Sequence, residues 1–157
     1  LKSLQDFGGR ISEDSTIWIQ GESVESLRRR EEIIRKVKEG KIELEGSVLI
    51  GRHCMISDGV RIVDSTIDNY TRIGRNAVIE RSAVMDRAII GENAEIHGSI
   101  VGRHSNIKSS PDKVTRLLQT SVVAEDVTLE AGCHLVSSRI YPHKHVPEQS
   151  LVSTILE

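Results

Sequence analysis

The residues of this chain best suited to acid–base chemistry are its six histidines. Several of them stand at one recurring position of the sequence, in a polar column that holds His53, Tyr70, Arg87, His104, Asp126 and His143. A groove lined by such a column could bind an anionic ligand, and His104, beside a loop expected at about 108–117, would be its candidate general base. A structural interpretation competes with this one, because exposed corners are polar whatever their function.

The spacing of the histidines argues against a metal site. His97 and His104 are seven residues apart, and His143 and His145 are two apart. Neither spacing matches the grouped ligands of a zinc site. His143 and His145 flank Lys144 and could hold an anion weakly, although a solvated end of the molecule explains them equally well. We therefore predict no metal ligand.

A 17-residue period predicts the elements that would position these side chains. Its three aliphatic columns are Ile50, Ile67, Val84 and Val101; Ile56, Ile73, Ile90 and Ile107; and Ile62, Ile79 and Ile96. Within one period the steps are 6, 6 and 5 residues, so the chain makes three short strands and returns to its first face. This pattern predicts a triangular solenoid, whose short repeats bury their apolar edges only against the turns above and below.

Two segments interrupt the period. The segment at about 108–117, which contains the turn-forming letters KSSPDK, is predicted to be a loop insertion of five residues. The pattern is expected to resume at Leu118 and to end with Val146 and Val152. Near the start, residues 21–40 form a helix excursion, with the helix itself at about 22–39.

The helix carries its own start and stop signals. Ser23 is the expected N-cap, and Gly40 stands where a left-handed residue would end the helix. Val24, Leu27, Ile34 and Val37 mark the predicted apolar face.

Small residues and corner residues repeat with the same period. Small inward side chains are expected two residues before each aliphatic residue, as at Ser65, Ser82, Ser99, Ser121, Ser138, Cys54 and Cys133. Gly59, Asn76, Asn93 and Gly132 mark a repeated left-handed corner. Trp18 and Tyr141, near opposite ends of the solenoid, are expected to cap its core, and residues 146–157 to cover the last open edge.

Composition narrows the class of protein. The aromatic content of 3% suits a narrow core of Ile, Val and Ala, and the 157 residues make one domain. A net charge of −2 argues against nucleic-acid binding, and no apolar run reaches membrane-spanning length. The two cysteines have no ligand spacing, so we expect buried, reduced thiols and a cytoplasmic protein.

Hexapeptide units written IGRHCM, IGRNAV and IGENAE resemble the left-handed parallel β-helix family. The resemblance implies an all-β fold, a single-stranded left-handed β-helix of about seven triangular turns, although parallel crossovers are normally right-handed. Members of this family are commonly trimers, which implies a homotrimer or higher homo-oligomer.

A narrower resemblance rests on SLRRREEIIRKVKEGKIELEGSVLIG, on turns such as DSTIDNYTRIG and RSAVMDRAIIG, and on the ending RIYPHKHVPE. Together these look like the carboxy-terminal domain of archaeal-type sugar-1-phosphate nucleotidylyltransferases, similar to mannose-1-phosphate guanylyltransferases. The resemblance implies an oligomerisation or regulatory domain. Its amino-terminal catalytic domain would bind NTP and Mg²⁺, and because Leu1 is not an initiator Met we expect that domain upstream.

No catalytic residue is transferred from that family, because its phosphate-binding segment GGxGTR does not occur in residues 1–157. Gly8, Gly9 and Arg10 lack the strand-to-helix context that cradles phosphate. We expect no cofactor within these residues.

The alternative function is acyl transfer. Many proteins that this chain resembles in fold use acetyl-CoA in a groove between subunits, and some fuse such a domain to a nucleotidylyltransferase. Under this alternative the substrate would be a sugar or sugar phosphate, and His104 and His143 would be the candidate catalytic residues. Zinc-dependent carbonic anhydrases of the same fold are a third class, but their pair of histidines five residues apart is not found in this sequence.

Overall fold

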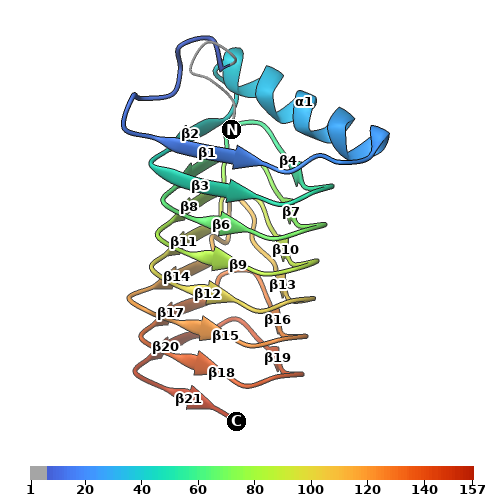
Figure 1. Cartoon of the computed structure of the whole chain (residues 1–157). Coiled ribbons are helices and arrows are strands. Elements are labelled where there is room, and N and C mark those ends of the chain that lie inside the picture. The colour runs from blue at the N-terminus through green and yellow to red at the C-terminus, as the bar shows by residue number, and fades with distance from the viewer. Residues whose placement is uncertain (1–6) are drawn as a thin grey trace.

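A computed structural model describes residues 7–157 as a triangular prism of stacked turns (Figure 1). Every strand pairing is parallel, and the chain winds downward as a left-handed β-helix, as the resemblance implied. Three flat sheets form its faces, which we name first, second and third in the order that the chain visits them. This confirms the predicted all-β solenoid of about seven turns.

The first sheet has eight strands and the other two have six and seven. The first comprises β1 (Thr16–Ile19), β3 (Ser47–Ile50), β6 (Thr66–Ile67), β9 (Ala83–Val84), β12 (Ile100–Val101), β15 (Val122–Val123), β18 (Arg139–Ile140) and β21 (Ile155–Leu156). The second comprises β4 (Met55–Ile56), β7 (Arg72–Ile73), β10 (Ile89–Ile90), β13 (Asn106–Ile107), β16 (Thr128–Leu129) and β19 (His145–Val146). The third comprises β2 (Glu43–Glu45), β5 (Arg61–Val63), β8 (Val78–Glu80), β11 (Glu95–His97), β14 (Arg116–Leu118), β17 (His134–Val136) and β20 (Ser150–Val152).

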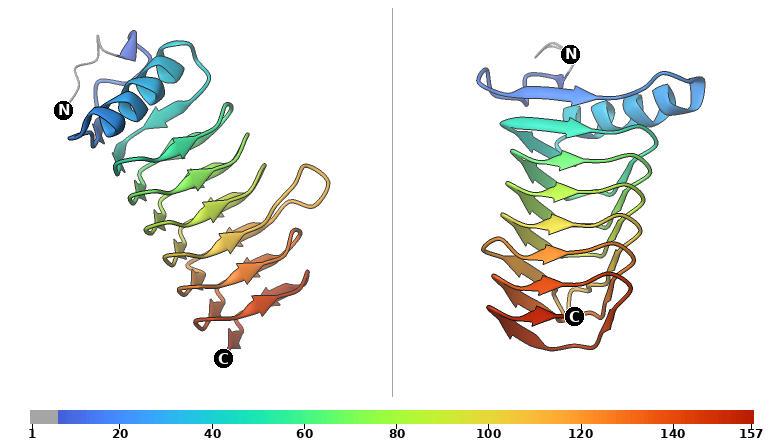
Figure 2. Two further views of the ribbon diagram at one scale, coloured as in Figure 1. Left: turned by 90° about the vertical axis from the view of Figure 1, so that its right-hand side faces the viewer. Right: turned by 60° about the horizontal axis from the view of Figure 1, so that its bottom comes forward.

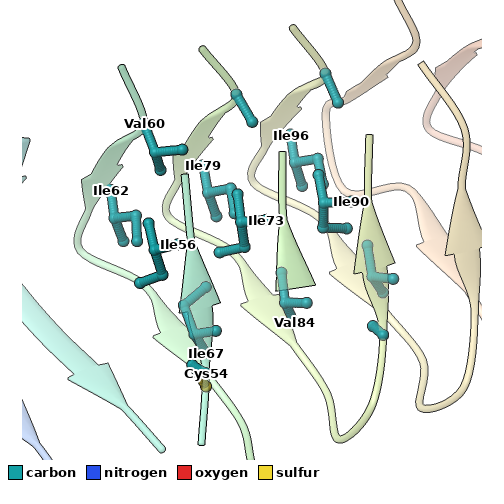
Figure 3. Close-up of a cluster of buried hydrophobic side chains, with 14 of the residues drawn as sticks. Cys54, Ile56, Val60, Ile62, Ile67, Ile73, Ile79, Val84, Ile90 and Ile96 are labelled. Atoms are coloured by element: carbon teal, nitrogen blue, oxygen red, sulfur yellow. The ribbon is translucent and has the colours of Figure 1, made fainter. Parts of the chain in front are cut away.

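The aliphatic columns of the sequence form the core. Ile50 pairs with Ile67, Ile56 with Ile73, and so on down each sheet, which places like residues above one another. Figure 3 shows these side chains pointing inward from all three faces. The expected small residues between them are buried as predicted, including the five serines and both cysteines. Because a serine column offers hydroxyls to the next turn, the Ser82 and Ser99 amides each donate to the hydroxyl one turn earlier, at 3.1 and 3.0 Å.

Helix α1 (Val24–Lys38) covers the amino-terminal end of the prism (Figure 1). The predicted cap is confirmed, since the Ser26 amide donates to Ser23 Oγ, and Gly40 has φ +75°. The predicted apolar face is only half right. Ile34 and Val37 are buried together with Ser26 and Ile33, whereas Val24 and Leu27 lie at the surface, 79% and 39% exposed. The first turn of the helix projects sideways beyond the turns stacked below it (Figure 2), and the side chains of Val24 and Leu27 are left exposed there.

The loop insertion lies where the sequence predicted it, and its exact length needs correction. The core residue after it is Leu117, which pairs with Ile96, and Leu118 points outward. Ile107 to Leu117 spans ten residues where Ile90 to Ile96 spans six, so four extra residues lie in the loop between β13 and β14. The fifth lies in the next corner, where Gln119 and Thr120 both have positive φ. Figure 2 shows the loop projecting beyond the neighbouring corners.

The end of the solenoid also differs from the expectation. Leu151, not Val152, pairs with core residue Leu135, and Val152 is 66% exposed, because the step from Val146 is five residues here. Trp18 and Tyr141 cap nothing, since both point outward with 44% and 47% exposure. The amino-terminal cap consists instead of α1 with buried Phe7 and Ile42. Among residues 7–157, no helix has the length and apolar character to cross a membrane.

Candidate functional site

The polar column proposed from the sequence lies at the corner between the first and second faces. All six residues adopt left-handed backbone, with φ between 54° and 63°. From Tyr70 onward each amide at this corner donates to a carbonyl of the preceding turn, as from Arg87 to the Asn69 carbonyl at 2.9 Å. The corner therefore places one side chain per turn in a vertical file on the outside of the prism.

The upper part of this column is a stack of flat groups. The rings of His53 and Tyr70 lie 4.9 Å apart at an interplanar angle of 12°, and the Arg87 guanidinium lies 4.8 Å from the Tyr70 ring centre. A planar cation over an aromatic ring is an attractive arrangement. Arg87 also forms an ion pair with Asp86 of its own turn. We interpret the stack as local stabilisation of the corner.

The lower part of the column contains the two candidate bases. His143 Nδ1 lies 3.3 Å from Asp126 Oδ2, a pairing that can orient an imidazole, although the His143 side chain is 69% exposed. Within residues 7–157 the His104 ring makes no hydrogen bond or ion pair, and its side chain is exposed. His104 precedes β13 and the insertion follows it, so the two lie at opposite corners of the second face. The expected partnership of His104 with the loop is therefore not formed.

The third face carries a ladder of alternating charges that the periodicity argument missed. Arg61 contacts Glu43 and Glu45 of the turn before it and Glu80 of the turn after it. His97 lies 3.3 Å from Glu80 and 3.7 Å from Glu95. The ladder continues as Arg116 Nε donates to Glu95 Oε2 at 2.6 Å and an Arg116 Nη lies 3.3 Å from His134 Nε2. The ladder could have been predicted from the sequence, because oppositely charged residues recur about one turn apart.

A polar groove of about 490 Å³ lies between the insertion loop and the third face. Lys113, Arg116, His134 and Glu148 line it. Lys113 Nζ lies 2.8 Å from Glu148, and this hydrogen bond raises the pKa of Lys113. Since Arg116 is also paired with Glu95, an anion entering the groove would have to displace carboxylates.

Metal and phosphate chemistry finds no support among the described residues. Residues 7–157 contain no group of three or more His, Cys, Asp or Glu side chains placed to hold a metal ion. Cys54 and Cys133 are both buried and unpaired, and burial raises the pKa of both thiols, that of Cys54 to about 11. Gly8 and Gly9 have positive φ and form a turn, while α1 begins only at Val24.

The first face is the apolar one. Its outward residues include Leu49, Met85 and Ile100, each between 41% and 43% exposed. Between them lies a shallow hollow of about 420 Å³, which is lined by the short side chains of Thr66 and Ala83. We call this region, from Leu49 to Ile100 with Thr66, Ala83 and Met85, the first-face patch. No acid–base group lies in it except Asp68 at its edge.

Comparison with known proteins matches residues 63–156 to the model of a protein family described as the GMPPB C-terminal domain. That stretch is more than half of the chain. The "Bifunctional protein GlmU" of Lactobacillus delbrueckii subsp. bulgaricus is 28% identical over 113 residues, which cover 65% of this chain and 24% of that protein. The protein of the same description from Thermodesulfovibrio yellowstonii is 38% identical over 65 residues, covering 41% and 14%. The chain thus spans a quarter or less of the length of these relatives.

Solved structures support the fold. PerB from Caulobacter crescentus, in complex with CoA and GDP-perosamine, superposes with a TM-score of 0.57 at 18% identity, covering 82% of this chain and 64% of that one. The acetyltransferase domain of PglB from Neisseria gonorrhoeae, in complex with acetyl coenzyme A, gives 0.55 at 14% identity, covering 77% and 62%. At such identities the likeness concerns the fold alone.

Proposed function

The chain belongs to the family of GMPPB C-terminal domains, and from this we propose that it is the oligomerisation or regulatory domain of a sugar-1-phosphate nucleotidylyltransferase. Such an enzyme joins an NTP to a sugar 1-phosphate and releases pyrophosphate. The family match over residues 63–156 is the observation that carries the proposal. The relatives described as bifunctional, of which this chain matches a quarter or less, support a role beside a second domain.

The chemistry of the proposed enzyme belongs to a catalytic domain amino-terminal to these residues. Mg²⁺ and an NTP do not fit residues 7–157, which offer no group of acidic side chains placed to hold a metal ion and no glycine-rich turn leading into a helix. The role left to this domain is mechanical. A prism held by parallel ladders on three faces is stiff along its axis, and it can hold copies of the enzyme together as a homotrimer or higher homo-oligomer. Two buried free thiols support a cytoplasmic location.

The test uses the intact polypeptide encoded by the natural gene. Pyrophosphate release is measured with a panel of NTPs and sugar 1-phosphates, for the intact protein and for a version without residues 1–157. We expect transfer by the intact protein, and a smaller native mass with altered activity for the shortened one. An intact protein that releases no pyrophosphate with any pair would contradict the proposal.

Acyl transfer is kept as a second candidate function because of the pairing between His143 and Asp126. In that reaction a sugar hydroxyl or amine would attack the thioester of acetyl-CoA. The acyl C–S bond would break, coenzyme A would leave as a thiol, and His143 would accept the proton of the nucleophile. Thiol release from acetyl-CoA, measured with sugar phosphate and amino-sugar acceptors, tests it. Loss of that release in His143→Ala, with His104→Ala retaining it, would support this candidate, and no release by the wild-type chain would exclude it for those acceptors.

A further inference from the structure

The loop between β13 and β14, which projects from the prism in Figure 2, is held in one shape by its own hydrogen bonds. At its tip, Ser110 and Lys113 exchange two backbone hydrogen bonds of 3.1 Å. At its base, buried Thr115 donates from Oγ1 to the Lys108 carbonyl at 2.6 Å and accepts from the Gly132 amide at 3.1 Å. Binding residues commonly lie on loops that a rigid scaffold positions. This braced loop is a fixed wall of the polar groove described above.

The third face changes in charge below this loop. On β2, β5, β8 and β11 the outward residues include four glutamates: Glu43, Glu45, Glu80 and Glu95. From β14 to β20 no outward residue is acidic. They are Arg116, Leu118, His134, Val136, Ser150 and Val152. The loop adds a lysine to this stretch, so one groove is lined by three nitrogen-bearing side chains: Lys113, Arg116 and His134.

Several N–H groups of the groove have no partner within residues 7–157. The Arg116 guanidinium uses Nε for Glu95 and one Nη for His134, which leaves its other Nη unpaired. Because an arginine N–H can only donate, His134 Nε2 accepts, and the ring proton lies on the unpaired Nδ1. Lys113 Nζ carries three N–H groups, of which Glu148 accepts one. Unpaired donors around a concave surface favour a ligand that is rich in acceptors, such as a phosphate.

The two carboxylates of the groove indicate what else the ligand carries. The side chains of Lys113 and Glu148 are 59% and 50% exposed, and such an exposed ion pair contributes little, so a phosphate can replace Glu148 at Lys113. Arg116 can keep Glu95 meanwhile, because its second Nη is unpaired. The released Glu148 and the exposed Asp112 can only accept hydrogen bonds, which suits hydroxyl groups. A phosphate joined to a polyol therefore matches the groove better than a bare anion does.

The size and the apolar part of the groove fit a sugar. Its volume of about 490 Å³ lies in the range of small-molecule sites, roughly 300–1,000 Å³. Pro111 and Val114 of the loop line it as well, and they offer apolar surface on which the carbon face of a sugar ring can pack.

We propose that the groove between the insertion loop and the third face binds a sugar monophosphate. Lys113 and Arg116 hold its phosphate, while Glu148, Asp112 and His134 bind its hydroxyl groups. The proposal rests on the proposed function, because sugar phosphates are the class of substrate named there, and it gives the regulatory role of this domain a ligand.

The test is calorimetric titration of residues 1–157 at constant ionic strength. Glucose 1-phosphate, mannose 1-phosphate, glucose and inorganic phosphate are titrated separately into the wild type, Lys113→Gln and Arg116→Gln. Lys108→Gln is the matched control. Lys108 belongs to the same insertion, is 47% exposed and pairs with Glu130 at 3.1 Å, but it does not line the groove. Circular dichroism and melting temperature check that each variant folds.

We expect at least one of the two sugar phosphates to bind with a Kd of about 1 mM or below, and glucose and inorganic phosphate to bind at least about tenfold more weakly. Lys113→Gln and Arg116→Gln should each weaken binding by about fivefold or more, and Lys108→Gln by no more than about twofold. Absence of binding by both sugar phosphates overturns the proposal. Equal affinity for inorganic phosphate, or an equal effect of Lys108→Gln, overturns it as well, because either result shows only a general attraction of charge.

Glu148→Gln tests the exchange of partners at Lys113. Without the carboxylate, Lys113 is released, so inorganic phosphate should bind about threefold more tightly or better. Unchanged or weaker binding of inorganic phosphate would overturn the placement of the phosphate at Lys113, and the proposal with it.

These titrations measure binding to residues 1–157, whereas the test of the nucleotidylyltransferase measures pyrophosphate release by the intact protein. Transfer by the intact protein without binding here refutes this inference alone. Binding here without pyrophosphate release refutes the proposed function and leaves the sugar phosphate site standing.

Discussion

At the corner between the first and second faces, backbone geometry is constant while side chains vary widely. One left-handed conformation is shared by His53, Tyr70, Arg87, His104, Asp126 and His143. From Tyr70 onward their amides also donate in the same way to the preceding turn. The left-handed region costs a non-glycine residue roughly 1–2 kcal/mol, which these hydrogen bonds and the cooperative stacking of turns offset. A histidine at this corner therefore does not by itself indicate catalysis. Only the contact between Asp126 and His143 favours a catalytic role.

The buried thiol of Cys54, in the second turn, makes the folded state less stable at alkaline pH. Burial raises the pKa of Cys54 from 9.0 to about 11, so between pH 9 and 11 the unfolded chain releases this proton while the folded chain keeps it. The free energy of unfolding therefore falls as the pH rises, by about 2–3 kcal/mol at pH 11. We expect the free energy of unfolding from urea titrations to fall by this amount more in the wild type than in Cys54→Ala. Parallel curves for the two proteins from pH 8 to 11 would contradict the assignment.

At the scale of the element, the turns are fitted to one another by glycines of two kinds. Gly98 has φ +56°, and an added Cβ would approach only the Thr120 nitrogen, at 4.0 Å, which is an ordinary contact. Gly102 has no such φ, but an added Cβ would lie 2.4 Å from the carbonyl carbon of Ala124 in the next turn. The first glycine permits a conformation, whereas the second permits the close stacking of two turns.

These two glycines should respond differently to the same substitution. Gly98→Ala should destabilise the fold by about 1–2 kcal/mol, and Gly98→Asn by less, because asparagine tolerates the left-handed region. Gly102→Ala should cost about 3 kcal/mol or more, since backbone of the next turn has to move. Thermal and urea unfolding of the three variants give the order. A Gly98→Ala variant less stable than Gly102→Ala would show that strain, not stacking, dominates.

The sequence predicted elements well wherever one residue type repeats in every turn. The aliphatic columns, the serines and the left-handed corner of Gly59, Asn76, Asn93 and Gly132 could be located from spacing, because each of these positions favours one kind of residue. The left-handed backbone at the corner of the histidine column was not predicted, because its side chains are of many types. Leu117 and Leu118 could not be distinguished, since both are equally apolar and the insertion had removed the register. Val24 and Leu27 were placed on the buried face of α1 by helical spacing, which carries no information on how far the helix overhangs the prism.

The candidate site was less predictable than the fold, for a physical reason. Whether His104 meets the insertion loop depends on which corner each occupies, and the fold puts one strand between them. The ladder from Arg61 through Glu80 and His97 to Arg116 depends on side chains from four turns, so it becomes visible only when the turns are stacked.

At the scale of the whole molecule, the two ends of the prism are built differently. Helix α1 and Phe7 cover the first turns, whereas the last described turn ends in β20 and β21, where Leu151 and Leu156 are only partly buried. Stability in such a stack is approximately the sum of contacts between neighbouring turns. The ends are consequently where the stack opens first.

Removal of the residues after Pro147 tests the contribution of that last turn. The truncation takes away β20 and β21 and uncovers the core residues Leu135 and Ile140, with which they pair. We expect the melting temperature to fall by at least about 5 °C and aggregation to increase, because a fresh parallel edge is exposed. Val152→Ser, at a side chain that is already 66% exposed, is the control and should melt as the wild type does. Unchanged melting of the truncated chain would contradict a stabilising role for this turn.

Because each turn has 17 residues, the length of the domain changes in steps of one turn. Each complete turn adds about 4.8 Å to the distance between the overhanging helix and the far end, and it leaves the direction of every face unchanged. Removing one whole turn would bring whatever is attached to the two ends closer by one such step without rotating either. Losing a part of a turn would instead turn one end against the other, so the chain can change its length by whole turns only while its neighbours stay in line.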